Sequence, residues 1–302
     1  MKIREFIYMD FERLKSIISQ IEEGLIISSQ HSKSISQEDS ASVGGSLFNF
    51  LKAEGGSAYV WQEEELNTQY LHDNIYTKVE DALISNNVLT RIPEDFLKES
   101  IEINEVRNKL SETSFILIRG KIFINDFNRM RMILENYNEI GDFLANCSTS
   151  SLPPDTPKKL KDQKISEMKK SMTLDNKYVK GLIRFIDVFY KDRLIVKSLP
   201  FNSLPDLRFA GNLTKLSLRE DISNIIYKYG TAPTTDWTIF AQLSFIPEEK
   251  REAITPVING NPIDLAFQKI FDSIRNVELD AQSVLYPEIA ITPIAIYRQI
   301  GG

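Results

Sequence analysis

Two residue types on which much enzyme chemistry depends are nearly absent from this chain. Its 302 residues include one cysteine, Cys147, and two histidines, His31 and His72. A single cysteine excludes an intramolecular disulfide and a zinc site built from several cysteines. A Ser-His-Asp or Cys-His site would need one of the histidines, but His31 lies in a polar segment and we expect His72 on a solvated helix face. The sequence therefore disfavours nucleophilic hydrolysis and zinc chemistry.

Phosphate-binding motifs and membrane-length apolar runs are missing as well. Glycine pairs occur at 44–45 and 55–56, but neither is followed by Lys-Ser or Lys-Thr, and there is no Gly-x-Gly-x-x-Gly. No apolar run approaches the roughly 18 to 20 residues that a membrane helix needs. We expect neither a bound cofactor nor a membrane partner.

The rest of the composition is ordinary for a globular protein. Hydrophobic residues make up 42% and charged residues 26%, and the formal net charge is −6. A net negative charge disfavours bulk attraction to nucleic acid. Because the first predicted strand begins almost at Met1, we expect no signal peptide and a cytoplasmic location.

The N-terminal pattern predicts a short strand followed by an amphipathic helix. Residues 6–8 are apolar, Asp10 is a suitable N-cap, and one helix face carries large aliphatic residues: Leu14, Ile17, Ile18 and Ile21. Residues 28–57 are then polar and small, which is more typical of a mobile segment or one ordered by a partner than of a catalytic lid.

Further strands and helices follow on both sides of a proline-rich segment. Residues 115–118 and 121–124 predict two strands joined by a bend at Gly120, and Asp126 predicts the cap of a helix that continues to Tyr137. Residues 148–157 contain three prolines and predict a linker. We therefore expect an α+β protein of two mixed α/β modules with small, mainly antiparallel sheets. The modules would span residues 1–147 and 158–302.

One set of carboxylates has the spacing of a metal-dependent nuclease. Such a site needs an Asp and a Glu-x-Lys on neighbouring strands, and Asp236, Glu248 and Lys250 have tolerable spacing. Pro247 interrupts the second strand directly before the acid. This remains one alternative function.

A basic segment gives a second alternative, binding of nucleic acid. Residues 158–180 contain eight lysines and three acidic residues, hence a net charge of +5. The lysines are spread around a predicted helix, and the segment has no arginine to read bases. Its candidate binding residues are Lys158, Lys159, Lys161, Lys164, Lys169 and Lys170.

The chain also resembles a known family. The residues concerned are the opening Phe-Ile-Tyr-Met-Asp with its Ser-Ile-Ile-Ser-Gln-Ile core, residues 115–126, and the closing Ile-Thr-Pro-Ile-Ala-Ile-Tyr-Arg of 291–298. These resemble a family of prokaryotic proteins that carry a domain of unknown function. The resemblance implies a bacterial, cytosolic protein near mobile-element or phage-defence functions, and it supplies no catalytic residues.

The function expected from the sequence is therefore non-enzymatic. We expect a binding, sensor or assembly subunit that contacts a protein partner or a second copy of itself. The metal-dependent enzyme and the nucleic-acid-binding protein stay open as alternatives.

Overall fold

The structure is a computed structural model that describes residues 3–32, 64–96, 102–249, 261–282 and 284–300. The chain folds into two compact units. Unit 1 comprises residues 1–123, 197–246 and 287–302, and unit 2 comprises residues 124–196 and 247–286.

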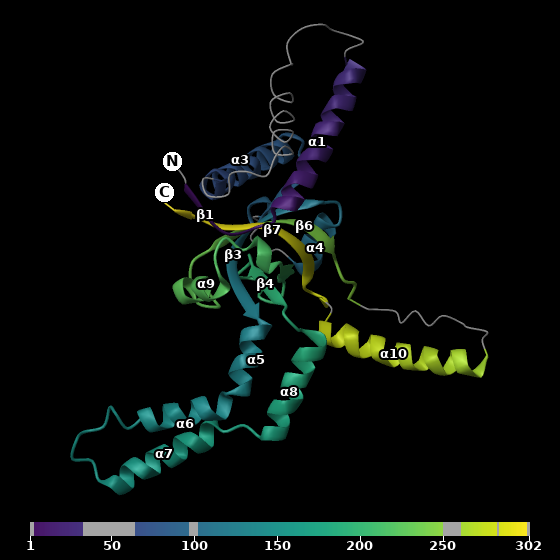
Figure 1. Ribbon diagram of the computed structural model, residues 1–302. Helices are drawn as coiled ribbons and strands as arrows, with labels where there is room; N and C mark the ends of the chain where they lie inside the picture. Colours follow the sequence, from purple (N-terminus) through teal and green to yellow (C-terminus); the bar gives the residue numbers. More distant parts are fainter. Residues whose placement is uncertain (1–2, 33–63, 97–101, 250–260, 283, 301–302) are drawn as a thin grey trace. The chain divides into compact units, whose positions relative to one another are not determined.

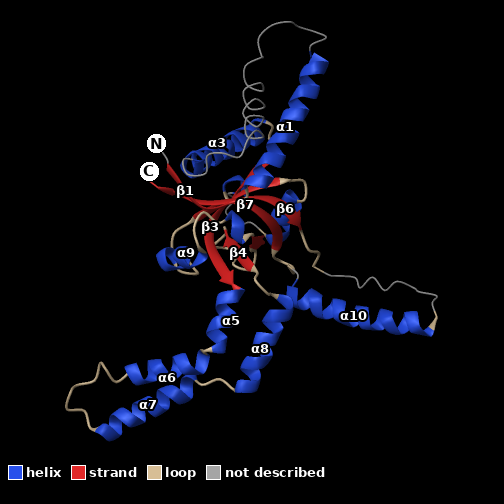
Figure 2. Cartoon of the chain, viewed as in Figure 1, coloured by secondary structure: helices blue, strands red, loops and turns tan. Residues whose placement is uncertain are grey.

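Unit 1 contains most of the strands. Its elements are β1 (Ile3–Met9), α1 (Phe11–Ser32), α3 (Glu64–Ser85), β2 (Leu89–Ile92), the 3-10 helix η1 (Glu94–Phe96), α4 (Ile103–Leu110), most of β3 (Phe115–Asp126), the end of β4 (Leu194–Leu199), β5 (Phe209–Leu213), the 3-10 helix η2 (Lys215–Ser217), α9 (Ile222–Tyr229), β6 (Trp237–Phe245) and β7 (Ile289–Ile300). Figure 2 distinguishes these strands from the helices by colour. The remaining parts of β3 and β4 belong to unit 2.

Within the described residues, the strands form one seven-stranded mixed sheet that closes on itself. Neighbours run β3–β6–β7–β5–β4 and back to β3, while β1 and β2 extend the sheet beside β7 and β3. The β3–β6 and β6–β7 pairs are antiparallel, whereas β2–β3 and β5–β7 are parallel. The expected α+β class is confirmed. The expected detail of small, mainly antiparallel sheets differs from this single mixed sheet.

Apolar side chains on alternate residues fill the interior of the closed sheet. Ile118, Ile239 and Ile296 are register partners on three successive strands, and all three are fully buried. β-branched residues suit such packed, pleated surfaces. The interior is therefore a packed core.

The bend predicted at Gly120 is not found in the structure. Strand β3 runs without interruption from Phe115 to Asp126. A Cβ atom at Gly120 would lie 2.5 Å from the carbonyl oxygen of Leu199. The residue is needed for close approach of two backbones.

Helices α1 and α3 cover the outer face of the sheet (Figure 1). Asp10 accepts a hydrogen bond from the backbone N–H of Arg13, as expected for an N-cap. Leu14 and Ile18 of α1 pack with Tyr76, Val79 and other α3 residues against β6 and β7. Ile18 is 5% exposed, which confirms its predicted burial.

Unit 2 is mainly helical. It contains α5 (Phe127–Glu135), α6 (Tyr137–Cys147), α7 (Lys158–Met172), α8 (Asn176–Phe189) and α10 (Pro262–Gln282). Asp126 caps α5 by accepting from two backbone N–H groups, as predicted. The predicted continuous helix ends two residues early, because Asn136 separates α5 from α6.

The predicted linker lies within the described residues, whereas most of the predicted mobile segment does not. Residues 148–157 connect α6 to α7, two helices that lie side by side in unit 2 (Figure 1). That residues 148–157 link two separate modules stays a prediction. Of the segment 28–57, residues 28–32 form the end of α1, and residues 33–57 lie outside the described residues.

Candidate functional site

A polar pocket lies in unit 1, on the outer face of the sheet beside helix α3. Its volume is about 410 Å³, within the usual range of roughly 300–1,000 Å³ for small-ligand sites. Its lining comes from seven elements and consists of Arg4, Glu80, Asp81, Ile84, Arg91, Glu94, Leu117, Arg119, Thr238, Tyr297 and Gln299.

Strand register explains why these distant residues meet. Arg91 of β2 is the partner of Leu117 on β3, and two residues further Arg119 is the partner of Thr238 on β6. Thr238 in turn pairs with Tyr297 of β7. The floor therefore crosses neighbouring strands, and α3 supplies one wall.

Arg4 is held firmly at one side of the pocket. Its Nη2 donates to Oε2 of Glu80 at 2.5 Å, and its guanidinium lies 5.1 Å from the ring centroids of both Tyr76 and Tyr297. Glu80 is only 6% exposed. A buried carboxylate needs such a partner, so Arg4 and Glu80 neutralise each other.

The tyrosines complete this network. The Tyr76 hydroxyl lies 3.3 Å from both Oε1 of Glu80 and the hydroxyl of Tyr297. Burial raises the pKa of Tyr76 well above its usual value and also raises that of Tyr297. Burial alone would lower the pKa of Arg4, but Tyr297 and Glu80 outweigh it, so that pKa is raised. All three groups keep their ordinary protonation states at neutral pH.

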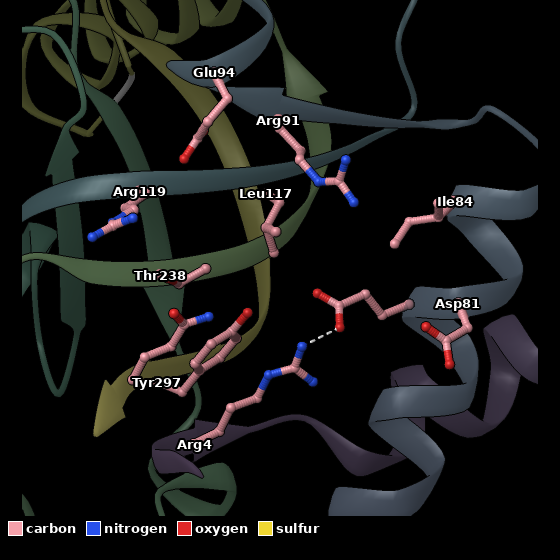
Figure 3. Close-up of a pocket in the computed structure, with 11 residues that line it drawn as sticks. Arg4, Asp81, Ile84, Arg91, Glu94, Leu117, Arg119, Thr238 and Tyr297 are labelled. Atoms are coloured by element: carbon pink, nitrogen blue, oxygen red, sulfur yellow. Dashed lines mark hydrogen bonds and ion pairs between the residues drawn. The ribbon is translucent and has the colours of Figure 1, made fainter. Parts of the chain in front are cut away.

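Four other charged side chains line the pocket: Arg91, Arg119, Asp81 and Glu94. Within the described part of the chain, none of the four makes an ion pair. All four residues are exposed. Figure 3 shows Arg4 and Arg91 extending toward the pocket from opposite sides, with Leu117 and Thr238 between them.

Charged side chains dominate the chemistry of the pocket lining. Among the described lining residues there is no histidine, cysteine or serine to act as a nucleophile or its base. No group of three or more His, Cys, Asp or Glu among the described residues is placed to hold a metal ion. Guanidinium groups, however, bind carboxylates and phosphates through paired hydrogen bonds.

The predicted lysines lie elsewhere, in unit 2. All six candidates, Lys158, Lys159, Lys161, Lys164, Lys169 and Lys170, are on α7. Lys169 forms an ion pair with Asp142 of α6 at 3.2 Å, and Lys161 donates to the backbone oxygen of Pro154. They lie on one helix but around its circumference, and their role as a binding surface stays a prediction.

The predicted metal-binding acids do not form a described cluster. Asp236 belongs to unit 1 and pairs with Lys121 at 3.0 Å. Glu248 is exposed and belongs to unit 2, while Lys250 lies outside the described residues. The nuclease alternative stays a prediction.

The two histidines and the cysteine are not among the residues that line the pocket. His72 is partly buried and its ring stacks on Phe11 with centroids 3.5 Å apart, which differs from the solvated position that the sequence predicts. Burial, followed by the charges of Arg219 and Lys15, lowers the pKa of His72 to about 4. Cys147 is free and exposed at the end of α6, and His31 is in the last turn of α1.

The pocket residues were not predicted from the sequence. Arg4, Arg91 and Arg119 are scattered over 116 positions, and only the pairing of β1, β7, β6, β3 and β2 brings them together. The one local signal is the alternation of β3, which places Arg119 on the same face as Leu117.

Comparisons with known proteins give one family. No curated protein and no solved structure is significantly similar to the chain. None of the described helices is both long and apolar enough to cross a membrane. The model of a domain of unknown function, DUF6414, matches residues 3–297, which is nearly the whole chain. The chain therefore belongs to the DUF6414 family.

Proposed function

We propose that this protein is a non-enzymatic binding protein, a sensor, that takes a small anionic molecule in the unit 1 pocket. The observation that carries the proposal is the pair Arg91 and Arg119. Both residues line a pocket of about 410 Å³, and neither guanidinium group has an ion-pair partner in the described part of the chain.

The arrangement of the third arginine supports this proposal. Arg4 is neutralised by Glu80 and fixed between two tyrosine rings. It therefore forms part of a rigid wall, and Arg91 and Arg119 are left to pair with an incoming charge. Preformed walls reduce the ordering cost of binding.

The acids in the pocket narrow the class of ligand. Asp81 and Glu94 likewise make no ion pair with any other described residue. A bare anion would meet their repulsion, whereas a molecule that also carries an amine or N–H donors would pair with both signs. Amino acids and nucleotides meet this description, and inorganic phosphate does not.

The proposal is tested by thermal unfolding with defined probes. We would compare inorganic phosphate, a nucleoside monophosphate, glutamate and the cationic spermidine, each at millimolar concentration. A ligand of the folded state raises stability in proportion to the logarithm of its concentration over Kd. We expect the nucleotide or the amino acid to raise the midpoint and spermidine to leave it unchanged.

A matched pair of variants then locates the binding site. Arg119→Gln should abolish the shift, whereas Arg184→Gln, the same change at an exposed residue of α8, should retain it. No shift with either proposed class, or an equal shift in both variants, would contradict the proposal. A tight response to spermidine alone would also contradict it.

The biological setting is part of the proposal. A bacterial cytosol is proposed from the family resemblance, and phage defence is the first context to examine. The genes that neighbour this one would identify that context most directly.

A further inference from the structure

Helix α10 of unit 2 carries an exposed apolar stripe. Asn261 caps the helix by accepting from the backbone N–H groups of Ile263 and Asp264. Six large apolar side chains on α10 are between 47% and 67% exposed: Ile263, Phe267, Ile270, Phe271, Ile274 and Val277. These fractions already include the neighbouring helix α8.

The spacing of the stripe is that of a coiled-coil seam. Five of the six residues follow one another at intervals of four, three, four and three. In a heptad this assigns Phe267 and Ile274 to a positions and Ile263, Ile270 and Val277 to d positions. Such a seam is self-complementary, because each a or d side chain fits between the same residues of an identical helix.

The exposed area is large enough for a specific contact. At roughly 150–200 Å² for a large apolar side chain, six such chains about half to two-thirds exposed present roughly 500–700 Å² per copy. Two copies would bury roughly 1,000–1,400 Å², which reaches the lower range of specific interfaces. A patch of this size is at or above the largest found on most monomeric proteins.

The residues beside the seam are compatible with a parallel arrangement. In parallel coiled coils, a g position faces the e position five residues later on the neighbouring helix. Here Ala266 would face Phe271, and Ser273 would face Glu278. The first pair joins a small and a large apolar side chain, and neither pair brings like charges together.

We infer that α10 is a self-association surface through which copies of this chain form a parallel helical bundle. The β-branched residues at the d positions favour three helices over two. This inference is independent of the pocket in unit 1, and either can fail alone.

Mass measurement of the full chain tests the inference. Light scattering during gel filtration at about 10–100 μM should give a multiple of the 34.6 kDa chain, three-fold by preference. Ile274→Glu should give the monomer mass. Asn276→Glu introduces the same charge two residues away, off the seam, and should keep the wild-type mass.

Two further measurements exclude unfolding as the cause of lost association and test the parallel arrangement. Far-ultraviolet circular dichroism should show equal helix content in both glutamate variants, so that loss of association is not loss of folding. In a Cys147→Ser background, Ile270→Cys should form a covalent dimer under mild oxidation, because equivalent d residues meet in a parallel bundle. A wild-type monomer throughout this range, or association that survives Ile274→Glu, would overturn the inference.

Discussion

Removing Arg4 tests the electrostatic anchor of the pocket. Its guanidinium has three partners in unit 1: the carboxylate of Glu80 and the rings of Tyr76 and Tyr297. The Arg4→Met variant keeps much of the side-chain volume but leaves the buried Glu80 with the Tyr76 hydroxyl as its remaining hydrogen-bond partner among the described residues.

The magnitude follows from the burial of the pair. The side chains of Arg4 and Glu80 are 26% and 7% exposed, so solvent screens this pair less than an ordinary surface pair. Breaking a buried pair from one side costs about 3–5 kcal/mol. Because Arg4 is partly exposed and solvent screens its charge, we expect a smaller cost than this range, about 2–3 kcal/mol.

A double-mutant cycle separates the pair from its surroundings. The Glu80→Met variant should also be destabilised, because it leaves Arg4 without its carboxylate. The double variant should recover most of the loss, since apolar replacement of a buried pair is often close to neutral. The coupling energy should therefore exceed about 1.5 kcal/mol.

Urea unfolding followed by tryptophan fluorescence is the assay. A Trp61→Phe background leaves Trp237, a fully buried residue of unit 1, as the reporter. If Arg4→Met unfolds within about 0.5 kcal/mol of its background, or if the two single losses add in the double variant, the pair is a surface contact and our reasoning is wrong.

Three further predictions concern the fold: two on packing and one on the pH dependence of stability. Ile18→Ala should lower the free energy of unfolding by about 2–5 kcal/mol, because it empties a buried site between α1 and the sheet; an unchanged urea midpoint would contradict that packing. Gly120→Ala should cost about 1–3 kcal/mol through its contact with the Leu199 carbonyl, while Gly181→Ala in α8, where a Cβ meets nothing within 4 Å, should be neutral or stabilising. The pKa of His72 is lowered to about 4 from an unfolded value near 6.5, so the unfolded state binds more protons between these values, and stability should fall as pH decreases from about 6.5 to 4. The stability of the His72→Gln variant should fall less over this range. Asp73, whose pKa burial raises, acts in the opposite direction in both proteins and therefore cancels in the comparison.

Local sequence signals predicted local structure well. The caps at Asp10 and Asp126 each accept the expected backbone hydrogen bonds, because a capping side chain acts within three residues of itself. Gly120 shows the limit of such reasoning. A glycine in a strand fits either a bend or a close approach, and the neighbour that decides between them, Leu199, is 79 residues away.

The candidate site could not be predicted from local sequence signals, for the same reason. Arg91 and Arg119 acquire a common setting only through the parallel pairing of β2 with β3. The run of lysines in α7 gave a stronger signal in the sequence, but charge density along one helix says little about a concave site. Pairing over long sequence distances was the missing information.

Calorimetric titration with the anionic probe that stabilises the protein tests the central claim most directly. The claim is that Arg91 and Arg119 of the unit 1 pocket bind the anionic group. A charge-assisted hydrogen bond contributes about 1.5–3 kcal/mol, so Arg91→Gln should weaken binding by roughly ten- to a hundredfold, while Arg184→Gln binds as the wild type. Equal affinity of Arg91→Gln and wild type would contradict the claim.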